Sequence, residues 1–189
     1  VVLAFGPGYA MGWALRVPVR LRVFYAPLLT FALVGVSAIV LGKTGIAWSL
    51  ISFVPVAAVL VAAAAGVMHL VGRRWPSAVP DASSEAAENW AGNTVPVAWP
   101  VIGAVLGGFL TLHATEDMVF GPEAFSQTLD NSFHMNAIRW IQEHGDASSL
   151  TMGAVSGMNQ EPYFYPAGWH DFVYLIYSTT GTSIATATI

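Results

Sequence analysis

The chain has 189 residues, of which 55% are hydrophobic and only 10% are charged, and its formal net charge at pH 7 is −4. Soluble domains usually carry about 25% charged residues, so this composition indicates a membrane protein. The acidic balance without a basic stripe argues against a nucleic-acid partner. The absence of cysteine excludes disulfides, cysteine-based zinc sites and cysteine nucleophiles.

Four apolar segments follow one another in the first part of the chain. Residues 1–15 are short for a membrane span, which needs roughly 20 residues, and an internal Gly-Pro-Gly would kink or break a helix, so we expect a partial or re-entrant span. Segments 24–41 and 46–71 are long enough to cross a bilayer. The segment 97–112 is rich in glycine, which either suits close helix packing or is simply tolerated. An all-α transmembrane bundle of about four to five spans is therefore predicted.

The basic residues set the expected orientation. Five of the seven lysines and arginines lie in the loops 16–22 and 73–96. Short loops rich in Lys and Arg stay in the cytoplasm, so these two loops of the membrane region 1–112 are expected there. Residues 113–171 then form an acidic extracytoplasmic region. Residues 172–189 would begin a further, incomplete membrane segment, either a fifth span or a helix lying in the interface.

An amphipathic helix is predicted near residues 128–144, because apolar residues recur at spacings of three and four and Gly145 can end the helix. Asp130 and His134 are four residues apart and face the same way on such a helix. This pair could act as a general base with an orienting or protonating histidine, or hold a metal bound to a pyrophosphate. Alternatively, Asp130 only favours the helix dipole and His134 is a packed side chain.

A second polar cluster, residues 163–171, precedes the last apolar stretch and contains Tyr165, Trp169 and His170. Aromatic side chains there can belong to an interfacial belt or stack on the apolar faces of sugars, and the sequence does not separate the two uses. No His-x-x-x-His or Glu-x-x-His spacing occurs, so a metal site built by the protein alone is only weakly indicated.

The motifs Asp-x-x-Phe-His-x-Asn-Ala-Ile-Arg-x-Ile from residue 130, Gly-Asp-Ala-Ser-Ser-Leu from 145 and Tyr-Pro-Ala-Gly-Trp-His from 165 resemble an actinobacterial family of multi-pass membrane proteins. That family is regarded as similar to glycosyltransferases of the C-type superfold (GT-C). The resemblance implies a polyprenyl-phosphate sugar donor, chemistry at the outer membrane face and a catalytic acid in an extracytoplasmic loop, matched here to Asp130. It also implies that the chain is the N-terminal part of a longer protein.

The first functional hypothesis is therefore a polyprenyl-phosphate-sugar-dependent glycosyltransferase of the cell envelope. Asp130 and His134 would be catalytic, and no cofactor is expected with certainty, although a divalent metal could accompany the lipid phosphate. Arginine suits bidentate phosphate contacts, and the expected substrate-binding residues are Arg139, Asn136, Tyr165, Trp169 and His170.

The alternative hypothesis is a non-catalytic membrane subunit that docks to other membrane or envelope proteins through its acidic outer layer. A transporter component is less well supported, because no apolar segment carries a buried charge. The expected partners are the lipid bilayer, the sugar donor and other membrane subunits.

Overall fold

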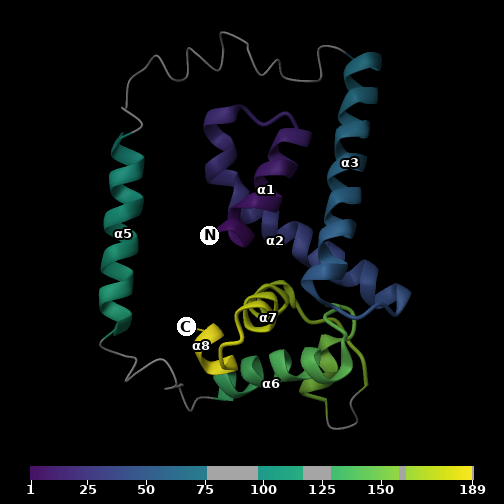
Figure 1. Cartoon of the computed structure of the whole chain (residues 1–189), viewed down its shortest axis with the longest axis vertical. Coiled ribbons are helices and arrows are strands. Elements are labelled where there is room, and N and C mark those ends of the chain that lie inside the picture. Colours follow the sequence, from purple (N-terminus) through teal and green to yellow (C-terminus); the bar gives the residue numbers. More distant parts are fainter. Residues whose placement is uncertain (76–97, 117–128, 158–160, 189) are drawn as a thin grey trace.

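The computed structural model describes residues 1–75, 98–116, 129–157 and 161–188 (Figure 1). Within these ranges the protein is all-α, with seven α-helices, one short 3-10 helix and no strand. The elements are α1 (Val2–Ala14), α2 (Val19–Thr44), α3 (Leu50–Arg74), α5 (Ala98–Glu116), α6 (Leu129–His144), η2 (Met152–Val155), α7 (Gly168–Thr180) and α8 (Ile184–Thr188).

Two helices, α2 with 26 residues and α3 with 25, are long and apolar enough to cross a membrane. At 1.5 Å per residue each is nearly 40 Å long, and the hydrocarbon core of a bilayer measures about 30 Å. Helix α1 has only 13 residues, and the apolar part of α5 is the shorter stretch Ile102–Ala114. The described part of the chain thus contains two candidate spans, and the predicted four to five are not shown.

Helices α1 and α2 pack with their backbones in close contact at Gly8. A Cβ atom at this position would lie 1.8 Å from the main-chain oxygen of Ala26, so only glycine fits. The Gly8 amide donates a hydrogen bond to the Thr30 hydroxyl at 2.9 Å. This bond suits a site where Pro7 interrupts the hydrogen-bond pattern of α1.

The connection between α2 and α3 joins these helices to the C-terminal half of the protein. Gly45 ends α2 in a left-handed conformation with φ 69°. Trp48 follows and is buried. Its amide donates to the carbonyl of Gly145 at 2.8 Å, and its indole N–H donates to the main-chain carbonyl of Asp171 at 3.1 Å. One residue therefore fixes the end of α6 and the start of α7 against the α2–α3 hairpin.

Helices α6, α7 and α8 lie at one end of the molecule, and the α1–α2 connection and the C-terminal end of α3 lie at the other (Figure 1). The predicted amphipathic helix is confirmed as α6, which runs crosswise to α3 and is followed by Gly145 at φ 68°. Helix α7 has 13 residues and ends at Gly181, so it is short for a span. Most of the predicted loop 73–96 lies outside the described residues.

Candidate functional site

The candidate site is a pair of histidines where α6 meets α7. The Nδ1 atom of His134 lies 2.9 Å from Nε2 of His170, a hydrogen-bond distance. His134 is on α6, three and four residues before the fully buried Ala137 and Ile138, so the packing of this helix turns it toward α7. His170 is in the first turn of α7 and only 2% exposed, whereas His134 is partly exposed.

Aromatic rings surround this pair on several sides. Ring centroids of Trp169, Tyr165 and Phe133 lie 5.1, 5.7 and 5.9 Å from that of His170, and Trp169 and Phe133 present their edges at about 90°. Trp169 is also 5.4 Å from His134. Because Trp169 is 39% exposed, the aromatic frame extends from the buried imidazole to the surface. Edge-to-face packing of this kind favours a fixed ring geometry.

The environment of His170 keeps its imidazole neutral. The pKa of His170 is lowered from 6.5 to about 4, mainly by burial and secondly by the charge of His134, while a backbone hydrogen bond to Ala167 offsets part of this effect. At neutral pH, one nitrogen of the His134–His170 contact therefore donates and the other accepts. If His170 donates, His134 accepts at Nδ1 and keeps its proton on Nε2, the nitrogen that remains for an external group.

Asp171 lies next to His170 and is fully buried. Neither of its carboxyl oxygens has a hydrogen-bond partner among the described residues. Burial, and secondarily the negative charge of Asp146, raises the pKa of Asp171 well above its usual value. Burial therefore favours the protonated form of this carboxyl, which lies beside the His pair.

The Gly-Asp-Ala-Ser-Ser segment that follows α6 positions the site through hydrogen bonds. Asp146 Oδ1 accepts a hydrogen bond from the amide of Ser148 at 2.9 Å and so closes the turn. The Ser149 hydroxyl accepts from the amide of Ala167 at 3.0 Å, and the Ser149 carbonyl accepts from the amide of Tyr165 at 2.8 Å. Since Ala167 immediately precedes α7, these bonds position the start of that helix and thus His170.

The structure brings together four of the predicted site residues: His134, Tyr165, Trp169 and His170. Asp130 is exposed in the first turn of α6, one helical turn before His134. Arg139 is exposed as well, and its guanidinium binds Glu143 at 2.6 Å.

Asn136 is also exposed, two positions beyond His134 on α6. Phe133 and Asp171 were not among the predicted site residues. The signal that could have found both is their position next to the two histidines.

A metal site is not formed by the described residues alone. No group of three or more His, Asp or Glu side chains gathers in the part of the chain that the structure describes. The two histidine nitrogens that could be ligands face each other at hydrogen-bond distance instead. No chemical step is therefore assigned to a metal here.

Comparison with known proteins gives a family. No curated protein and no solved structure matches the sequence. The model of a family of unknown function, DUF6541, matches residues 1–189, which is the whole chain. The chain therefore belongs to the DUF6541 family.

Proposed function

We propose that the chain is part of a cell-envelope glycosyltransferase that uses a polyprenyl-phosphate sugar at the outer face of the membrane. The observation that carries the proposal is the partly exposed His134, which contacts a buried neutral His170 and lies one helical turn after the exposed Asp130. The resemblance of the motifs around these residues to GT-C-like actinobacterial membrane proteins supports the same assignment.

The placement of the basic residues supports an outer location for the site. Helices α2 and α3 are long enough to span a bilayer. The arginine-rich α1–α2 connection and the end of α3 lie at one end of these helices, opposite α6 and α7 (Figure 1). Because arginine-rich loops remain in the cytoplasm, α6 and α7 are expected at the extracytoplasmic surface.

In the proposed reaction Asp130 is the general base. It takes the proton of the acceptor hydroxyl while the acceptor oxygen attacks the anomeric carbon of the sugar. The bond between that carbon and the phosphate oxygen breaks, polyprenyl phosphate leaves with the electron pair, and the anomeric configuration inverts. When His170 donates to Nδ1 of His134, the Nε2 proton of His134 is available for donation to a phosphate oxygen.

The exposed aromatic side chains near the His pair have the properties of a sugar or lipid-interface surface. Tyr163, Phe164 and Trp169 are all at least 39% exposed, although each is large and partly apolar. Aromatic faces at the membrane surface can stack on a sugar and also anchor the site at headgroup depth. Arg139 pairs with Glu143 and must leave that partner to reach a phosphate.

A docking role in a larger membrane assembly is the second candidate, and helix α5 favours it. All of its described side chains, residues 102–114, are exposed, and most of them are apolar. Apolar helix faces without packing are typical of surfaces that meet another membrane subunit. This role and the transferase role are compatible, since subunits of an envelope enzyme also assemble.

The transferase proposal is tested by Asp130→Asn, with Glu143→Gln as the matched control on the same helix. Loss of a general base typically lowers turnover by about 10²–10⁴-fold. Loss of the surface ion pair at Glu143 releases Arg139 and should not lower turnover. Transfer from a synthetic polyprenyl-phosphate sugar is measured per folded molecule. Equal turnover of Asp130→Asn and Glu143→Gln would contradict the role of Asp130, leaving only a capping role worth about 1 kcal/mol.

A further inference from the structure

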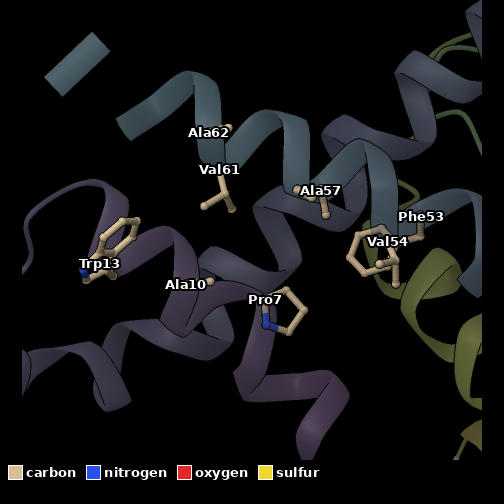
Figure 2. A pocket seen from close by; sticks show the side chains of 9 residues that line it. Pro7, Ala10, Trp13, Phe53, Val54, Ala57, Val61 and Ala62 are labelled. Carbon is tan, nitrogen blue, oxygen red and sulfur yellow. The ribbon is translucent and has the colours of Figure 1, made fainter. Parts of the chain in front are cut away.

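Helices α1 and α3 enclose an apolar hollow of about 410 Å3 (Figure 2). Pro7, Ala10 and Trp13 line it from α1, and α3 contributes a wall that includes Phe53 and Ala58. All nine lining residues are apolar, and four of them are alanines, whose short side chains leave the space open. The hollow is therefore a groove suited to a hydrocarbon chain.

A second hollow of about 320 Å3 adjoins the first, and unlike the first it has basic side chains in its lining. It is lined by Trp13, Ala14, Arg16, Ala65 and His69, so Trp13 borders both hollows. From Phe53 to His69 the helix rises by about 24 Å. The combined track is thus apolar along most of its length and ends at a guanidinium and an imidazole.

Arg16 lies just beyond the end of α1, in a backbone conformation that residues other than glycine rarely adopt. Arg16 ends α1 in a left-handed conformation with φ 58°, where the amide of Val17 donates to the carbonyl of Gly12 at 2.8 Å. Glycine is the residue that adopts this conformation at least cost. Replacement of Arg16 by glycine should therefore keep the helix end intact and remove only the charged side chain.

We propose that this track binds an anionic phospholipid, with an acyl chain between α1 and α3 and the headgroup phosphate at Arg16 and His69. Charge complementarity favours this occupant over a packed helix, because a helix would have to bring its own anion to the two basic groups. The cytoplasmic leaflet supplies anionic headgroups at that depth. The site is at the opposite end from His134 and His170, so it requires the membrane location of α2 and α3 but not the transferase activity.

The test uses quenching of Trp13 fluorescence by brominated lipids. The purified full chain is placed in phosphatidylcholine nanodiscs that contain a minor fraction of brominated phosphatidylglycerol or, separately, of brominated phosphatidylcholine. The difference from a Trp13→Phe variant isolates the signal of this residue among the seven tryptophans. We expect brominated phosphatidylglycerol to quench Trp13 at lower mole fraction than brominated phosphatidylcholine does.

Three variants identify the groups involved. Arg16→Gly should lower the preference for phosphatidylglycerol by about fivefold, because its side chain lines the second hollow and would contact the headgroup directly. Arg20→Gln removes an equal charge at the same end without lining the hollow and should keep the preference. Ala58→Phe should fill the groove and reduce quenching by both lipids.

Three results would overturn the proposal. These are equal quenching by the two lipids in the wild type, equal effects of Arg16→Gly and Arg20→Gln, and unchanged quenching in Ala58→Phe. A further arm adds soluble glycerol phosphate. If this headgroup analogue abolishes the lipid preference, the basic end is a site for a free phosphate and not for a membrane lipid.

Discussion

Acidification should destabilise the protein through His170. The pKa of this side chain is about 4 in the folded protein and near 6.5 when exposed. Between these values the unfolded chain binds a proton that the folded protein does not. The contribution of His170 to stability is therefore complete above pH 6.5 and is lost as the pH falls toward 4. The difference in pKa corresponds to at most about 3 kcal/mol.

Asp171 acts in the opposite direction over part of the same range. Its pKa is raised in the folded protein, so the folded state keeps a proton that the unfolded chain loses above about pH 4. Its contribution is complete below that value and falls as the pH rises. The net pH dependence of the wild type is a sum of both effects, and a variant is needed to isolate the histidine.

The assay compares thermal unfolding of the wild type and of His170→Gln in detergent between pH 4 and 8. The variant removes the titrating group, so its stability should fall less on acidification than that of the wild type. His144→Gln, at an exposed position, is the matched control for the loss of a histidine side chain. Parallel pH profiles of the wild type and His170→Gln would refute the reasoning about burial.

Three further predictions follow from packing, ionisation and topology. Gly8→Ala should lower the free energy of unfolding by about 3 kcal/mol, because the new Cβ meets a backbone oxygen of α2. Gly35 has open space around it, so Gly35→Ala should be neutral or stabilising, and chemical denaturation compares the two variants. Asp171→Asn should gain stability relative to the wild type as the pH rises from 4 to 8, and thermal unfolding that shows no such gain would contradict the raised pKa of Asp171. Single cysteines placed at the exposed positions Gln142 and Trp75 should differ in their labelling by an impermeant thiol reagent added to intact cells. Only the Gln142 position should be labelled, and equal labelling would contradict their location on opposite sides of the membrane.

The local elements were largely predictable from the sequence. Apolar runs of membrane length gave α2 and α3, and the spacing of apolar residues with Gly145 gave α6. Such features depend on residues that are near one another in the chain. The same spacing also indicates where Arg139 lies, because five residues on an α-helix place it about 140° away from His134. Its ion pair with Glu143 agrees with that position.

The tertiary pairing of the histidines could not be predicted in the same way. His134 and His170 are 36 residues apart and belong to different helices, and their contact depends on how the loop at Ser149 positions the start of α7. The burial of Asp171 could not be predicted either, because an acidic residue in the first turn of a helix usually lies at the surface and interacts with the helix N-terminus. Trp48 contacts this turn from the distant α2–α3 connection, and its indole N–H donates to the main-chain carbonyl of Asp171.

Photocrosslinking of the donor tests the central claim most directly. The probe is a polyprenyl-phosphate sugar with a diazirine on the isoprene unit next to the phosphate, and labelled peptides are identified by mass spectrometry. The account predicts label in α6 and in residues 161–171, suppressed by unmodified donor and reduced in His134→Ala but not in Gln142→Ala. Label elsewhere only, or label that the unmodified donor does not suppress, would contradict a lipid-linked sugar site at His134 and His170.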